Sequence, residues 1–286
     1  EPLPLAPQEL VGTAGFALSP DRTRIVAEVG GDPVQLWLFD VDRAGGQRLT
    51  RDGGTWPVWS ADGEWVYFGV EGDDGTEIWR KRADLSGEAE QVYAGPGAQR
   101  PRSVSTDGAY LYFEQVPDAS GDRGWGRLSL DGDRTAEVIV EGRGIESSPW
   151  PSPDGRFVAY NSDESGEAQV YVIELATGRR WLLSTGAGPG YISTWTESGE
   201  IVFWSNTDSM TSVAVTTEPE FTHAPPVVLH RRPGQFYPYE VTSDGQRFVH
   251  TVRSDAADDT GTPPASSRVL VVQNWFEELK RFVPVR

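Results

Sequence analysis

Short segments in which apolar and polar residues alternate recur along the whole chain, and the same kind of polar turn precedes many of them. Two clear examples are WSADGEWVYFGVEG at residues 59–72 and SPDGRFVAYNSDE at residues 152–164. Alternation over four to eight residues is typical of a half-buried β-strand, and Gly, Asp and Pro between such runs mark turns. The pattern therefore predicts an all-β protein built from many short strands.

The polar turn returns at a nearly constant interval. Its central residue falls at six positions, separated by 41, 45, 47, 44 and 46 residues. These positions are Asp21, Asp62, Asp107, Asp154, Ser198 and Asp244. A period in the forties made of alternating strands is typical of a β-propeller with one four-stranded blade per repeat. We therefore predict a six-bladed β-propeller of four-stranded antiparallel blades, with residues 1–286 as a single domain.

The turn itself has a structural explanation. Ser and Asp side chains accept hydrogen bonds from backbone N–H groups a few residues ahead, and Gly takes the left-handed conformation that closes a hairpin. One Asp in each blade also places the six far apart around a ring, which does not suit a metal site or a catalytic site. We expect these residues to hold the hairpins.

The two ends of the chain are predicted to complete the ring. The last blade lacks an outer strand, and the proline-rich residues 1–6 are the expected replacement because an outermost strand tolerates missing N–H donors. Residues 274–282, NWFEELKRF, carry the one helical signal, with Asn274 as the N-cap and apolar residues spaced by three and four. This short C-terminal helix is expected to cover the last blade.

Composition excludes several kinds of partner. The formal net charge is −18 and the pI is about 4.5, so nucleic acid and anionic lipid surfaces would be repelled. The chain has no cysteine, and its only lysines are Lys81 and Lys280. No apolar run reaches the roughly 20 residues of a membrane-spanning helix. Since the only methionine is Met210, we expect the sequence to be a fragment of a longer protein.

The sequence contains no recognisable catalytic or metal-binding motif. It lacks the Gly-x-Ser-x-Gly elbow of a hydrolase and the phosphate-binding and catalytic loops of a kinase. His223, His230 and His250 are not spaced as metal ligands. The acidic loop from Asp255 to Asp259 has room for a cation but not the regular spacing of a known calcium loop, and we expect it to be solvated. No catalytic residue, cofactor or metal is predicted.

The abundant aromatic residues recur at equivalent positions of the blades. Trp37, Trp79, Trp125 and Tyr171 all fall in predicted third strands. We expect them to pack between blades rather than to form a ligand cage.

The channel lined by the innermost strands remains as the predicted binding region, since ligands of closed β-folds often bind at the mouth of the opening. The residues predicted to lie there are Arg100, Arg102, Glu146, Tyr191, Ser193, Tyr237, Tyr239 and Glu240. This set suits a small polar or anionic ligand or a peptide terminus. The alternative is that these residues only line a water-filled channel.

The repeats resemble those of the bacterial PD40, or TolB-like, propellers, whose SPDG signature is present at Ser152–Gly155. The segments VTTEPEF (215–221), VTSDGQRF (241–248) and VLVVQNWFEELKR (269–281) are similar to the final blades of propellers attached behind bacterial serine/threonine protein kinases. Blade one departs from the signature with Arg22 in place of glycine, and blade five with TESG. The resemblance implies a sensory or protein-interaction module outside the cytoplasmic membrane.

From these observations we expect a non-catalytic, monomeric propeller that binds a protein or a small polar ligand and belongs to a larger bacterial protein such as a kinase. The alternative is a propeller enzyme of the lyase, lactonase or glycosidase type that uses channel residues such as Glu146 and Glu240. A third idea, the gating propeller of a prolyl-oligopeptidase-like protease, needs a hydrolase domain that this sequence does not contain.

Overall fold

The computed structural model describes most of the chain. The described residues are 15–116, 123–184, 191–205, 209–231, 239–241, 247–253 and 267–273, except 42, 44, 143 and 145. Side chains are described for these residues other than 191–193, 205 and those from 230 onward.

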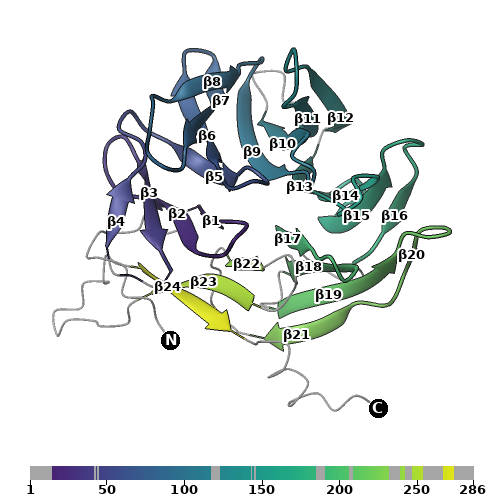
Figure 1. The fold of residues 1–286 in the computed structure, drawn as a ribbon. Coiled ribbons are helices and arrows are strands. Elements are labelled where there is room, and N and C mark those ends of the chain that lie inside the picture. The colour runs from purple at the N-terminus through teal and green to yellow at the C-terminus, as the bar shows by residue number, and fades with distance from the viewer. Residues whose placement is uncertain are drawn as a thin grey trace.

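Twenty-four strands form six antiparallel sheets arranged around a common centre (Figure 1). Blade one contains β1 (Phe16–Leu18), β2 (Arg24–Val29), β3 (Gln35–Asp40) and β4 (Gly46–Arg48). Blade two contains β5 (Thr55–Trp59), β6 (Trp65–Gly72), β7 (Gly75–Arg82) and β8 (Glu90–Tyr93). Blade three contains β9 (Ala98–Val104), β10 (Tyr110–Val116), β11 (Arg123–Ser129) and β12 (Ala136–Gly142).

The second half of the chain continues the arrangement. Blade four contains β13 (Glu146–Pro151), β14 (Phe157–Ser162), β15 (Gln169–Glu174) and β16 (Arg180–Leu182). Blade five contains β17 (Tyr191–Trp195), β18 (Glu200–Ser205), β19 (Ser209–Thr216), β20 (Thr222–His223) and β21 (Val227–Arg231), with β20 and β21 both paired to β19. The last sheet contains β22 (Tyr239–Val241), β23 (Arg247–Arg253) and β24 (Ser267–Gln273).

The structure confirms the predicted propeller of four-stranded antiparallel blades but not the full count of six. Five sheets have at least four strands, whereas β22–β24 form a three-stranded sheet. Its predicted fourth strand, residues 1–6, lies outside the described residues, and so does the predicted helix at residues 274–282. The described residues contain no helix, and therefore none that is long and apolar enough to cross a membrane.

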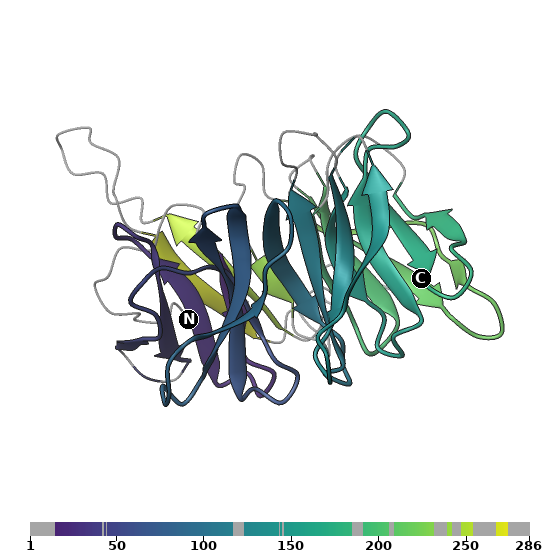
Figure 2. The same cartoon turned by 90° about the horizontal axis from the view of Figure 1, so that it is seen from above.

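The first strand of each sheet lies closest to the centre. Contacts run in order from β1 to β5, β9, β13, β17 and β22, and we call these six inner strands the hub. Figure 2 shows the ring edge-on, with the blades side by side and their strands running across its thickness. The hub is therefore built from segments that are far apart in the sequence.

The repeated turn closes in the same way in blades one to four, as blade two illustrates. Ser60 Oγ donates to Asp62 Oδ1 (2.5 Å), and the same oxygen accepts the N–H of Glu64 (2.9 Å). The hydroxyl of Ser60 also accepts the N–H of Trp65 (2.9 Å), while Gly63 has a φ of 71°. The Ser60 hydrogen bond is the main reason that the pKa of Asp62 is lowered. The predicted structural role of the turn is confirmed.

Related hydrogen bonds close the turns whose sequence departs from the signature. In blade one Arg22 takes a φ of 63° in place of glycine, and Ser19 still donates to Asp21 (2.6 Å). In blade five Thr196 and Ser198 share a hydrogen bond of 3.0 Å. The departures therefore change individual hairpins and leave the blades intact.

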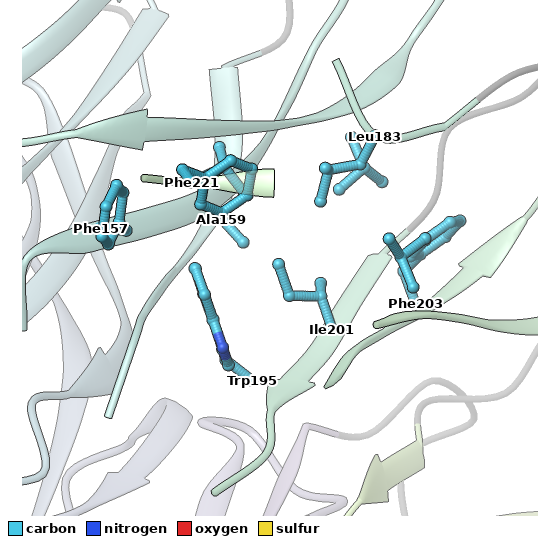
Figure 3. Close-up of a cluster of buried hydrophobic side chains, with 10 residues drawn as sticks. Phe157, Ala159, Leu183, Trp195, Ile201, Phe203 and Phe221 are labelled. Carbon is cyan, nitrogen blue, oxygen red and sulfur yellow. The ribbon is translucent and has the colours of Figure 1, made fainter. Parts of the chain in front are cut away.

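The hydrophobic core consists of separate clusters, most of which lie between two neighbouring blades. The cluster between blades four and five is centred on Phe157, Trp195 and Phe221 (Figure 3). Between blades three and four, Trp125 of β11 and Tyr171 of β15 share one cluster. The predicted packing between blades is thus confirmed for Trp125 and Tyr171, and for Trp79, which packs on a cluster shared by blades one and two. Trp37 packs on a cluster whose described members all belong to blade one.

One cluster contains residues of blade one alone. Its buried members are Ile25, Ala27, Val29, Phe39 and Val41. Figures 1 and 2 both place the sheet β22–β24 beside this blade. The first and last sheets of the chain are therefore neighbours in the ring.

Candidate binding site at the hub

The structure places the predicted channel residues on inner strands wherever it describes them. Arg100 and Arg102 lie on β9, Glu146 opens β13, Tyr191 and Ser193 lie on β17, and Tyr239 and Glu240 lie on β22. Tyr237 lies outside the described residues. Side-chain geometry is described for the two arginines and for Glu146, and the binding role of the whole set stays a prediction.

Arg102 belongs to a charged link between blades three and four. Its Nη2 donates to Oε2 of Glu114 on β10 at 2.6 Å, and Glu114 is 6% exposed. The other carboxylate oxygen accepts the backbone N–H of Ser148 on β13 at 2.8 Å. Ser148 has a φ of 54°, in the left-handed region that non-glycine residues rarely adopt. The carboxylate therefore satisfies an inner-strand N–H of the next blade.

The same arrangement joins blades one and two. Glu28 on β2 accepts the backbone N–H of Trp56 on β5 at 2.7 Å, and Trp56 has a φ of 50°. Burial raises the pKa of Glu28, while the N–H groups of Trp56 and Gly15 act in the opposite direction. We call each of these carboxylate-to-N–H links a clasp. Both receiving residues precede a proline and lie at a β-bulge, where the register shifts.

The glutamates of the two clasps occupy the same position in the sequence repeat. Glu28 and Glu114 each lie seven residues after the turn Asp of their blade. Blade two has Gly69 at this position, and blade four has Asn161, which is buried with its Oδ1 unpartnered. A carboxylate clasp is therefore present in blades one and three and absent from blades two and four.

Glu114→Ala should lower the free energy of unfolding by about 2 kcal/mol, because it leaves the Ser148 N–H without an acceptor and Arg102 without its partner. Glu114→Gln keeps an acceptor oxygen and should lose less. Urea unfolding measures both values. The matched control is Glu137→Ala, which removes an exposed partner of Arg127 and should change stability by less than about 0.5 kcal/mol. Equal losses for Glu114→Ala and Glu137→Ala would contradict the clasp.

Arg100 has a different environment from Arg102. Its guanidinium lies 4.4 Å from the centroid of the Trp56 ring, so it bridges the inner strands of blades two and three. Its Nε is buried without a hydrogen-bond partner. Sequence reasoning placed Arg100 at the hub, but it did not predict Trp56 as its stacking partner.

Glu146 is hidden rather than open to the hub. It is 6% exposed, and its Oε1 accepts a hydrogen bond from Ser162 Oγ at 2.8 Å. Its Oε2 has no partner. Burial raises the pKa of Glu146 to about 7, with the Ser162 hydrogen bond acting against the rise. A carboxyl group of this kind exchanges a proton near neutral pH, as a general acid or base must.

A pocket of about 520 Å³ lies away from the inner-strand arginines. It is formed by the β6–β7 turn and the segment before β9, and it includes Asp74, Glu77 and Pro96. The carboxylate of Glu77 is already engaged, because its Oε2 accepts hydrogen bonds from the side chains of Trp79 (3.0 Å) and Gln91 (2.7 Å). Asp73 and Asp74 form a two-residue hairpin turn, since Gly72 pairs with Gly75.

The described part of the chain contains no group of three His, Cys, Asp or Glu side chains suited to a metal ion. His223 lies on β20, His230 on β21 and His250 on β23. The acidic loop at residues 255–259 lies outside the described residues.

Comparison with known proteins gives several sequence relatives that match part of the chain, and several structural ones. No protein-family profile matches the chain. The Tol-Pal system protein TolB of Methylococcus capsulatus is 39% identical over 98 residues, which covers 32% of this chain and 20% of that protein. The aligned segment thus spans a fifth of the relative's length.

Solved structures extend the similarity to most of the fold. A putative TolB from Agrobacterium tumefaciens has a TM-score of 0.61 at 14% identity, covering 78% of this chain and 83% of that one. An oligogalacturonate lyase in complex with manganese has a TM-score of 0.59 at 16% identity, covering 94% of this chain and 76% of the other. At such identities these likenesses show the fold. Sequence and structure comparisons together show that the chain resembles the TolB-like β-propellers.

Proposed function

We propose that this chain is a non-catalytic binding propeller that recognises a protein partner, or a small polar ligand, at its hub. The observation that carries the proposal is how the hub uses its charged groups. The carboxylates of Glu28 and Glu114 accept backbone N–H groups and stabilise the ring. Arg100 keeps donors that no group of the described chain accepts. The carboxylates of Glu28 and Glu114, which link neighbouring blades, are thus distinct from the Arg100 guanidinium, which remains for a ligand.

We further propose that the ring has six blades within one domain. The buried face of blade one lies beside β22–β24, which supports closure of the ring by the first and last sheets. Residues 1–6 would supply the missing outer strand of the last blade. Attachment to a kinase or to another larger bacterial protein, and a location outside the cytoplasmic membrane, rest on the family resemblance.

The test is to identify a partner and to map where it binds. The purified chain is immobilised and used to capture proteins from a bacterial envelope extract, and each retained protein is then titrated against the free chain. Hydrogen–deuterium exchange should show protection at inner strands β5, β9 and β13, with little change at outer strands β4, β8 and β12. Protection confined to the outer strands, or no protein that binds the free chain, would contradict the proposal.

A catalytic role is the second candidate, and Glu146 is the observation that favours it. Its buried carboxyl group has a pKa of about 7, in the range that general acid–base catalysis uses. Ser162 is its only hydrogen-bond partner among the described residues, and acid–base hydrolysis or elimination needs further groups that converge on the same substrate atom. Turnover of an oligosaccharide or lactone by the purified chain that Glu146→Gln abolishes would establish this function in place of binding.

A further inference from the structure

Seven arginines in the described part of the chain stack on aromatic rings, and they differ in what else their guanidinium groups bind. Five donate hydrogen bonds to carboxylates or backbone carbonyls as well. These are Arg24 with Gly63 and Ala83, Arg80 with Glu90, Arg82 with Glu64, Arg127 with Glu137, and Arg156 with Thr217 and Glu218. Most of the stacked arginines therefore also donate hydrogen bonds to other groups of the protein.

Arg100 is an exception. It stacks on Trp56 at 4.4 Å, and none of its donors bonds to a described residue. The other exception, Arg179 on Trp181, is exposed, so water satisfies its donors. Arg100 is half-buried, and its Nε is shielded from water, as is that of Arg102. Arg102 differs because its Nη2 donates to Glu114, whereas the Nη groups of Arg100 bond to no described residue. A half-buried guanidinium with unused N–H groups costs free energy unless another group binds it.

The carboxylates nearest to Arg100 are already occupied. Glu114, which pairs with Arg100 across the β9–β10 ladder, uses one oxygen for Arg102 and the other for Ser148. Glu28 accepts the N–H of Trp56. Among the described residues, therefore, no carboxylate is hydrogen-bonded to Arg100.

The local charge favours an incoming anion. The positive charge of Arg102 acts on Arg100 and, after burial, is the next cause that lowers the pKa of Arg100. Glu114 and, more weakly, Glu71 act in the opposite direction. Glu114 is bonded to Arg102, and Glu71 is exposed and accepts a hydrogen bond from Thr76. Two guanidinium groups thus share one directly bonded carboxylate, in a protein whose formal charge is −18.

The stacking of Arg100 on Trp56 indicates which kind of anion would bind there. A guanidinium group presents parallel N–H donors that match the two oxygens of a carboxylate, and its planar shape lets both groups lie over an aromatic face. Trp56 supplies that face and excludes water from one side of the pair. A planar carboxylate satisfies these features better than a tetrahedral anion does.

We propose that Arg100, stacked on Trp56, binds a carboxylate group of the ligand at the hub, supplied by a peptide C-terminus or by an acidic side chain. This inference rests on the proposed binding function and adds the ligand class. Arg100 is the anion-binding residue, and Trp56 positions its guanidinium. Arg102 holds the clasp and raises the local positive potential.

The test uses three peptide probes that differ only in their carboxylates. They are acetyl-trialanine with a free C-terminus, its C-terminal amide, and acetyl-Ala-Asp-Ala-amide. Binding is followed by ¹⁵N NMR of the arginine Nε–H and tryptophan indole signals, because single-residue shifts remain measurable at the millimolar affinity expected of a lone carboxylate pair. We expect at least one carboxylate probe to shift the Arg100 and Trp56 signals, and the amide to leave them unchanged.

Substitutions then assign the effect to Arg100. Arg100→Gln should weaken carboxylate binding at least about tenfold, and Arg100→Lys should weaken it less because the charge remains while the fork is lost. Arg127→Gln is the matched control, since it removes the same charge from an arginine that stacks on Tyr110 and pairs with Glu137. Melting temperatures show whether each variant is folded.

Three results would overturn the inference. They are equal binding of the amide, equal loss in Arg127→Gln and Arg100→Gln, and inorganic phosphate binding as tightly as the carboxylate probes. These outcomes are separate from failure of the proposed function. A partner that protects the inner strands from hydrogen–deuterium exchange but binds the Arg100→Gln variant with unchanged affinity would contradict only the carboxylate assignment. The absence of any such partner would sink the binding function alone.

Discussion

Phe157→Ala should lower the free energy of unfolding by about 3–5 kcal/mol, the range for removing a large buried aromatic side chain. Phe157 is 2% exposed, and its ring centroid lies 5.3 Å from that of Phe221, 6.1 Å from that of Trp181 and 6.4 Å from that of Trp195. These rings come from blades four and five, so the cavity would open between two blades (Figure 3).

Urea unfolding measures the loss, and Leu182→Ala provides the control. Leu182 lies on the outer strand β16 and is 44% exposed, so its substitution should cost less than about 0.5 kcal/mol. If Phe157→Ala lowered the free energy of unfolding by less than about 1 kcal/mol, packing between these two blades would not be a main source of stability.

The second large effect concerns pH. Burial raises the pKa of Glu146 to about 7, whereas an unfolded glutamate titrates near 4.5. The folded state therefore binds more protons than the unfolded state between these values, so this group makes stability fall as pH rises from about 4.5 to 7. The difference between the two pKa values corresponds to at most about 3 kcal/mol in the free energy of unfolding. This contribution is lost completely above pH 7.

Glu146→Gln removes this dependence. The variant should be about as stable as the parent near pH 4.5 and more stable above pH 7, and the difference between the two proteins isolates Glu146 from other titrating groups. Urea unfolding at pH 5 and pH 8 gives the four values required. The charged groups that act on Glu146 are Asp163, Glu164 and Arg180.

Glu164→Gln is the control for these neighbours, because it removes a charge that pairs with Arg180 near the surface. It should leave most of the pH dependence in place. A stability difference between Glu146→Gln and the parent that is the same at both pH values would refute the buried-carboxyl explanation.

The sequence repeat correctly predicted the features that depend only on residues close together in the chain. The Ser60–Asp62 turn closes within five residues, so its residue types alone specify its hydrogen bonds. Third-strand aromatic residues were also predictable, because their position in the repeat places them at a blade face.

The sequence did not predict contacts that depend on how one blade meets the next. The N–H of Trp56 reaches Glu28 only because a β-bulge turns the inner strand, and the bulge depends on register between strands. The stacking of Arg100 on Trp56 joins residues that are 44 positions apart along the chain. Glu146 was predicted to lie at the hub, and only the structure shows that it is almost fully buried.

The buried face of blade one sets a condition on synthesis. As the ribosome releases the chain, each Ser-Asp turn closes at once, and blades two to five find a neighbour within the next forty or so residues. The buried apolar cluster of blade one lies in a sheet whose neighbour β22–β24 is synthesised last (Figure 1). Until that last sheet has been made, this apolar face of the first blade is open to solvent, so the blade can become fully stable only after almost the whole chain has been released.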